Sequence, residues 1–85
     1  MIENAVSMPI GLIAGGGQFP LLFAEAARAR GRRVIAMAHV HETSVELEQK
    51  ADVVYWVKLG QLGKIIKNFQ QEGVRETVFA GTITK

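Results

Sequence analysis

Cysteine is absent from the 85-residue sequence, which excludes disulfide bonds and thiolate metal ligands and fits a reducing compartment. No apolar run approaches the roughly 20 residues that a membrane-spanning helix needs. Charge of one sign is also scarce, since the net charge is only +2. The first eight residues carry Glu3 and no basic residue, so they do not resemble a signal peptide. A small globular domain is the class that these absences leave.

Hydrophobic residues make up 48% of the sequence, which is enough to build one core. A chain of this size buries only roughly 60–65% of its extended-chain surface, so its stability margin is thin. The one basic cluster consists of Arg28, Arg30, Arg32 and Arg33. It straddles the end of a predicted helix, where cations complement the helix dipole, and few aromatic residues accompany it. We interpret the cluster as a solvated helix end and expect no nucleic-acid partner.

Three consecutive glycines, Gly15, Gly16 and Gly17, follow an apolar run at residues 10–14 and precede a predicted helix. Because glycine has no Cβ, such a turn lets another molecule approach the main chain closely. The start of a helix also presents free N–H groups and positive dipole charge, which suit a phosphate. The alternative is that the glycines only form a tight strand-to-helix turn. Three glycines exceed what a turn needs, so we favour a ligand.

The glycine run does not match the two best-known nucleotide-binding patterns. A dinucleotide fingerprint requires Gly-x-Gly-x-x-Gly and an acidic residue about 20 positions later. The glycines here are contiguous, and the next one, Gly31, lies beyond the helix. No Gly-Lys-Ser/Thr follows either, which excludes a P-loop. We therefore do not expect NAD binding.

Apolar strand-like runs alternate with amphipathic segments after an N-terminal extension at residues 1–8, which we expect to be flexible. The predicted strands are residues 10–14, 33–40, 53–57 and 76–80, and the predicted helices are residues 18–30, 43–50 and 60–73. Alternation of this kind predicts a Rossmann-like, three-layer α/β domain over residues 9–85, with a four-stranded parallel sheet of order 3-2-1-4 and helices on both faces. The chain then reverses direction between the first and fourth strands, and ligands bind outside the carboxyl ends of such strands.

Other polar residues point less clearly to chemistry. His39 and His41 alternate at the end of the second strand, which is one way to hold a metal, but no third ligand follows at suitable spacing. We favour two exposed loop histidines, and the alternative is that one of them contacts a ligand, since they lie at the carboxyl end of a strand. Thr43 or Ser44 is expected to cap the second helix. The third helix has apolar residues at i, i+3, i+4 and i+7, namely Leu62, Ile65, Ile66 and Phe69. No catalytic triad or carboxylate pair is present at the predicted strand ends.

The run Ile10-Gly-Leu-Ile-Ala-Gly-Gly-Gly-Gln-Phe-Pro20 resembles the opening of the UDP-2,3-diacylglucosamine pyrophosphatases of the LpxI type. The resemblance continues through Ala51-Asp52, Gly60-Gln-Leu-Gly-Lys64 and Phe79-Ala-Gly-Thr-Ile-Thr-Lys85. Members of that family are longer, and their lipid substrate lies between an N-terminal and a C-terminal domain. They hydrolyse UDP-2,3-diacylglucosamine to 2,3-diacylglucosamine 1-phosphate and UMP in lipid A biosynthesis.

By this resemblance the chain is the substrate-binding N-terminal domain, and the catalytic acid and the Mg²⁺ site are expected in the C-terminal domain. No residue of this chain is expected to be catalytic or to bind metal. The expected substrate-binding residues are Gly15, Gly16, Gly17, Gln18, Gly81, Thr82, Ile83 and Thr84. The implied partners are UDP-diacylglucosamine or its lipid product, the C-terminal domain and a second copy of the chain. The implied location is the cytoplasm, with peripheral attachment to the inner membrane as an alternative.

Two other functions stay open from the sequence. The chain could be a stand-alone module that binds a nucleotide or phosphosugar without catalysis. It could also be a dimerisation domain without a ligand, because a four-stranded domain with one thinly covered sheet face exposes apolar surface.

Overall fold

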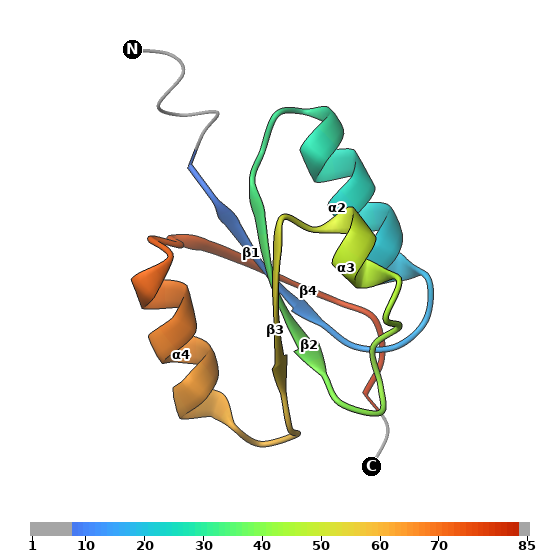
Figure 1. The fold of residues 1–85 in the computed structure, drawn as a ribbon, viewed down its shortest axis with the longest axis vertical. Helices are drawn as coiled ribbons and strands as arrows, with labels where there is room; N and C mark the ends of the chain where they lie inside the picture. The colour runs from blue at the N-terminus through green and yellow to red at the C-terminus, as the bar shows by residue number, and fades with distance from the viewer. Residues whose placement is uncertain (1–7, 84–85) are drawn as a thin grey trace.

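The computed structural model describes residues 8–83, in which strands and helices alternate along the chain (Figure 1). Of the predicted extension, residues 1–8, only Met8 lies in this part. The elements in order are β1 (Ile10–Ala14), α2 (Phe19–Ala29), β2 (Val34–His39), α3 (Leu47–Lys50), β3 (Val53–Val57), α4 (Leu62–Gln71) and β4 (Glu76–Ala80). The predicted strands and helices are present, but α3 is a single turn. Of its two predicted caps, Thr43 forms hydrogen bonds elsewhere, whereas Ser44 Oγ accepts one of 3.1 Å from the N–H of Glu46, just before α3.

The four strands form one sheet in the order β3-β2-β1-β4, and each neighbouring pair is parallel. The predicted order is therefore confirmed. Strand β2 lies inside the sheet and all six of its residues are buried, which explains its continuous apolar sequence. Strands β1 and β4 end together, since Ala14 pairs with Ala80. The loops that leave these two strands consequently start at the same edge of the sheet.

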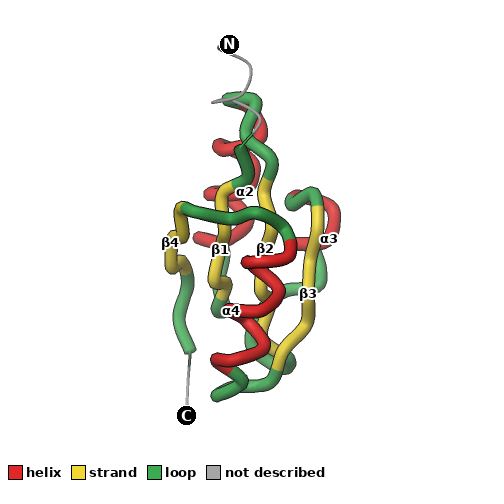
Figure 2. The backbone as a smooth tube through the Cα atoms, turned by 90° about the vertical axis from the view of Figure 1, so that its left-hand side faces the viewer, coloured by secondary structure: helices red, strands yellow, loops and turns green. Residues whose placement is uncertain are grey.

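Helices α2 and α3 cover one face of the sheet and α4 covers the other, so the fold has three layers (Figure 2). On the α4 side, Ile65 and Phe69 pack against buried residues of β2. The other two apolar positions of the predicted α4 stripe do not join this core, because Leu62 is 63% exposed and Ile66 is 49% exposed. One short helix is too narrow to bury its whole apolar face on a four-stranded sheet.

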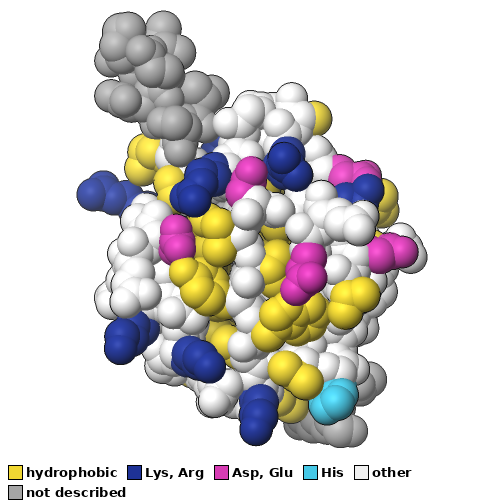
Figure 3. Space-filling model, viewed as in Figure 1, with side chains coloured by type: hydrophobic (Ala, Val, Ile, Leu, Met, Phe, Trp, Pro, Cys, Tyr) yellow, Lys and Arg dark blue, Asp and Glu magenta, His cyan; other side chains and the backbone are white. Residues whose placement is uncertain are grey.

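Apolar side chains remain uncovered at both edges of the sheet. Phe79 on the edge strand β4 is 77% exposed, and Phe19 and Leu22 of α2 are 70% and 54% exposed. Over β3, at the other edge, hydrophobic side chains gather between α3 and α4 (Figure 3). Such surface supports the expectation that the domain pairs with another body. Within residues 8–83 no helix combines the length and the apolar content needed to cross a bilayer.

Three arginines of the basic cluster are partly exposed and also form ion pairs. Their pairs are Arg28 with Asp52 at 3.6 Å, Arg32 with Glu76 at 2.9 Å and Arg33 with Glu72 at 3.6 Å. The cluster is therefore a partly exposed helix end in which three of the charges also have acidic partners. On the face shown in Figure 3, acidic side chains lie among the basic ones in the upper half, whereas the lower left carries basic side chains that are separated from one another.

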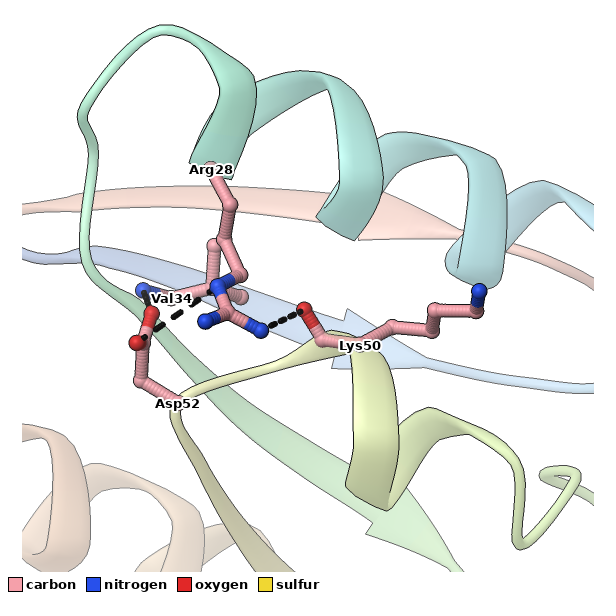
Figure 4. Close-up of polar contacts among 4 residues, drawn as sticks. All are labelled: Arg28, Val34, Lys50 and Asp52. Carbon is pink, nitrogen blue, oxygen red and sulfur yellow. Dashed lines mark hydrogen bonds and ion pairs between the residues drawn. The ribbon is translucent and has the colours of Figure 1, made fainter.

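Asp52 fixes the start of β2 beside the start of β3. Its Oδ2 accepts a hydrogen bond of 2.7 Å from the backbone N–H of Val34, and Oδ1 faces Nε of Arg28 (Figure 4). The same guanidinium donates to the carbonyl of Lys50 at 3.3 Å. A strand-initial aspartate thus closes the edge of the sheet opposite the candidate site.

Tyr55 and Glu72 connect β3 to the end of α4. The Tyr55 hydroxyl donates a hydrogen bond of 2.5 Å to Oε2 of Glu72. This bond, together with desolvation and the negative charge of Glu72, raises the pKa of Tyr55 above its ordinary value of 10.0. The contact is structural, because it lies away from the carboxyl ends of β1 and β4.

Candidate functional site at the carboxyl ends of β1 and β4

The loops that leave β1 and β4 meet and are hydrogen-bonded to each other. The N–H of Gly15 donates to Ala80 O at 2.9 Å, and the N–H of Gly16 donates to Thr82 O at 2.6 Å. Thr82 N–H donates in turn to Gly16 O at 3.3 Å, which completes an antiparallel bridge. Two segments that are more than 60 positions apart in the sequence therefore form one continuous seam. We call these residues, Gly15, Gly16, Ala80, Gly81 and Thr82, the glycine seam.

Three glycines of the site are required by the packing of the seam. A Cβ on Gly15 would overlap the backbone of Thr82, and a Cβ on Gly16 would lie 2.9 Å from the carbonyl oxygen of Glu42. Gly81 has a φ of +94°, and a Cβ there would lie 2.6 Å from Gly16 O. These contacts favour the tight-turn alternative for Gly15 and Gly16. Because their N–H groups already bond to backbone oxygens, neither residue offers a free donor to an anion.

Free donors begin one residue later, at the start of α2. Gly17 has a φ of +83°, and no atom lies within 4 Å of the position that its Cβ would take. Within residues 8–83 the N–H groups of Gly17, Gln18 and Phe19 have no hydrogen-bond acceptor. No side chain caps this helix, and its first turn contains no acidic residue. Three neighbouring N–H groups therefore lack an acceptor in this part of the chain at the positive end of the helix, an arrangement that suits an anion.

A buried polar network lies directly beneath the seam. Thr43 Oγ1 accepts a hydrogen bond from the N–H of His39 at 2.8 Å and donates one to Ala14 O at 2.8 Å. Nδ1 of His39 lies 2.9 Å from the same Ala14 oxygen. The network ties the end of β2 to the last residue of β1, and so it holds the origin of the glycine seam in place.

The prediction of two exposed loop histidines is wrong for His39, which is only 4% exposed and belongs to β2. His41 is exposed and follows in a left-handed turn with a φ of +72°, so the strand alternation has ended before it. Among residues 8–83, no three His, Cys, Asp or Glu side chains are grouped as metal ligands. Mg²⁺ prefers several oxygen ligands, which the residues around the seam do not supply.

A pocket of about 220 Å³ opens on the α4 side of the seam. Its walls combine backbone of the two loops with apolar side chains and one histidine, namely Ile13, Gly15, His39, Gly60, Gln61, Leu62, Ile65, Phe79, Ala80, Gly81 and Ile83. The start of α4 forms one wall, where Gln61 Oε1 accepts a hydrogen bond of 2.8 Å from the N–H of Lys58. The pocket lies where the reversal of the chain across the sheet predicted a ligand.

Seven of the eight predicted substrate-binding residues lie together around this edge, and Thr84 falls outside the described residues. Sequence reasoning gave a ligand contact by one of the two histidines only as an alternative, and it missed Thr43 as part of the site. The sequence pattern that could have identified His39 and Thr43 is a histidine at the end of an otherwise apolar strand, with a threonine four residues later. That spacing returns the hydroxyl to the strand end when the intervening residues form a tight turn.

The comparisons with known proteins agree with the resemblance that the glycine motifs carry. A family model described as the LpxI N-terminal domain matches residues 9–85. The UDP-2,3-diacylglucosamine pyrophosphatase LpxI of Caulobacter vibrioides is 35% identical to the chain over 78 residues. The match covers 89% of the chain and 26% of the relative, so the chain spans about a quarter of the relative's length. No solved structure matches. The chain therefore belongs to the LpxI family, whose N-terminal domain it matches from residue 9 onward.

Proposed function

We propose that the chain is the substrate-binding N-terminal part of an enzyme that hydrolyses UDP-2,3-diacylglucosamine. The relative from Caulobacter vibrioides carries that activity in its name. The observation that carries the proposal is the row of N–H groups at Gly17, Gln18 and Phe19 that have no acceptor within residues 8–83, at the same carboxyl edge of the sheet as the pocket on the α4 side. A nucleotide sugar brings a diphosphate to such an edge.

In this proposal the chain binds and orients the diphosphate and transfers no proton. The free N–H groups at the start of α2 donate to phosphate oxygens, and the helix dipole stabilises their negative charge. The glycine seam sets the position of that helix end relative to the sheet. Holding the diphosphate in one orientation is the catalytic contribution that such a site can make.

Water attack at the α-phosphate of the nucleotide would give UMP and 2,3-diacylglucosamine 1-phosphate. We propose that the catalytic acid and the ligands of Mg²⁺ belong to residues outside this chain, because no carboxylate lines the pocket. The 85-residue chain should accordingly bind substrate without turning it over. The enzyme as a whole would act in lipid A biosynthesis, at a substrate whose acyl chains also require apolar surface such as that of Phe79.

The test has two parts. First, UMP release is measured after the 85-residue chain is mixed with UDP-2,3-diacylglucosamine and Mg²⁺, and no turnover is expected. Robust turnover would refute the placement of catalysis outside this chain. Second, UMP and the lipid product are titrated into the chain by NMR. Binding of UMP that lipid substrate cannot displace would favour the alternative function, a stand-alone nucleotide-binding module.

A matched pair of variants isolates the backbone donors. Gln18→Pro deletes one N–H, and the φ of −85° at this position lies close to the value that proline requires. Gln18→Ala deletes only the side chain. Since a hydrogen bond to a charged group contributes about 1.5–3 kcal/mol, the proline variant should bind UMP at least about tenfold more weakly. The alanine variant should bind like the wild type. Equal binding by both variants would contradict the role of the amide.

A further inference from the structure

His39 has one ring nitrogen committed to the fold and one that is not. Nδ1 lies 2.9 Å from the carbonyl oxygen of Ala14, which can only accept a hydrogen bond. Nδ1 must therefore carry a hydrogen. In the neutral imidazole the other nitrogen, Nε2, then has a free lone pair and acts as an acceptor.

Nε2 of His39 has no hydrogen-bond partner within residues 8–83. Every fully buried side-chain nitrogen or oxygen in this range does have one. Although His39 as a residue is only 4% exposed, Nε2 must consequently reach solvent. The pocket beside the glycine seam is the cavity that His39 lines, so Nε2 faces into it. A nearly buried acceptor in an apolar wall requires a partner that donates a hydrogen bond.

Donors lie across the pocket, at the start of α4. Gly60, Gln61 and Leu62 form this wall. The Gln61 N–H donates to Lys58 O. The first N–H of α4 that forms a helical hydrogen bond is that of Ile65, which donates to Gln61 O. The intervening N–H groups, from Leu62 to Lys64, have no acceptor in the described part of the chain, as expected for a first helical turn. The pocket thus combines one acceptor with apolar walls and neighbouring donors.

We propose that this pocket binds the uracil ring of the nucleotide, with the uracil N3–H donating to Nε2 of His39. This inference rests on the proposed function, which supplies the UDP group. Uracil presents an N3–H donor, which complements the lone pair of His39 Nε2, and carbonyl acceptors, for which the N–H groups at the start of α4 are donors. A space of about 220 Å³ also suits a single ring better than a drug-sized ligand, whose pockets occupy roughly 300–1,000 Å³.

Other parts of the substrate fit the pocket less well. An acyl chain would leave Nε2 buried without a partner, which is unfavourable. An ionised phosphate has no hydrogen to donate to the neutral ring. Cytosine presents an acceptor at N3, where uracil has its donor. Gly15 and Gly81 belong both to the pocket wall and to the seam, so a base in the pocket would lie against the seam.

The test compares uridine with 3-methyluridine, which lacks the N3–H, by NMR titration of the 85-residue chain at about pH 8, where histidine is ordinarily neutral. Uridine should bind the wild type about tenfold more tightly than 3-methyluridine does. In His39→Asn, the Asn amide can still donate to Ala14 O but cannot replace Nε2. That variant should bind both nucleosides equally, at the affinity of wild type for 3-methyluridine. His41→Asn, at the exposed neighbouring histidine, should behave like the wild type.

Equal binding of the two nucleosides by the wild type would overturn the inference, and so would discrimination that persists in His39→Asn. If the Asn variant fails to fold, the wild-type comparison still decides. Binding of the lipid product without any binding of uridine would overturn the uracil site and leave the proposed function standing. Failure of uridine, UMP and lipid product alike to bind would overturn both.

Discussion

Replacing Gly15 by alanine should open the glycine seam, because the added methyl group would overlap the backbone of Thr82. The Cβ is fixed by the backbone of residue 15 and it meets backbone atoms of Thr82, so rotation of a side chain cannot relieve the clash. Opening the seam breaks the two hydrogen bonds between Gly16 and Thr82. At about 1 kcal/mol for each bond, and with strain in the adjoining strand ends, the expected loss is about 2–4 kcal/mol.

Gly17→Ala is the matched control for this substitution. Gly15 does not have a positive φ and is restricted only by space, whereas Gly17 has a φ of +83° and open space around it. The control should therefore cost only the left-handed backbone penalty, about 1–2 kcal/mol. The free energy of unfolding is measured by urea denaturation, and the thermal midpoint checks it. In a domain of this size each kcal/mol lowers the midpoint by about 4–8 °C.

The result that would refute this reasoning is a Gly15→Ala variant that is as stable as the wild type, or one less affected than Gly17→Ala. Either outcome would mean that the seam can accommodate the added methyl group without a loss of unfolding free energy. Packing would then not explain why residue 15 is a glycine, and contact of Gly15 with a ligand would become the better explanation.

Three further substitutions or conditions test the contacts around the sheet. Thr43→Val leaves the buried N–H of His39 unpaired and should cost about 1–3 kcal/mol of unfolding free energy, while Thr43→Ser should retain most of it. Asp52→Ala removes the acceptor of a β2 backbone N–H and should cost about 1–2 kcal/mol, with Asp52→Asn intermediate. Because the bond to Glu72 raises the pKa of Tyr55, its stabilisation is complete below about pH 10 and is lost as pH rises through the folded-state value. Unfolding titrations should show that loss in the wild type and not in Tyr55→Phe.

The layered fold was predictable because its signals are local. The continuous apolar run of β1 and the alternation of strands and helices determine a parallel sheet, and right-handed crossovers then limit the strand order. The edge that holds the site follows from that order. The strand order does not predict which N–H groups remain free of hydrogen bonds, because the bridge between Gly16 and Thr82 joins residues that are far apart in the sequence.

The histidines illustrate the limit of pattern reasoning most clearly. Two residues two positions apart look equivalent in a strand, but the chain turns at His41 and leaves only His39 inside the sheet. The turn returns Thr43 to the strand end, where its hydroxyl becomes part of the core and not a helix cap. The helical stripe fails in a similar way, since Ile66 is half exposed even though its spacing from Leu62 and Phe69 is ideal. Periodicity describes one element and says nothing of how much surface lies opposite it.

The most direct test of the account is an NMR titration of the 85-residue chain with UMP that follows the backbone amides of the two loops. The N–H groups of Gly17, Gln18 and Phe19 should shift strongly because they are free donors at a helix start. That of Gly16, which already bonds across the seam and does not line the pocket, should move much less. Phosphate binding without any shift at Gly17, Gln18 and Phe19, or no binding of UMP at all, would contradict the claim that this edge of the sheet holds the nucleotide diphosphate.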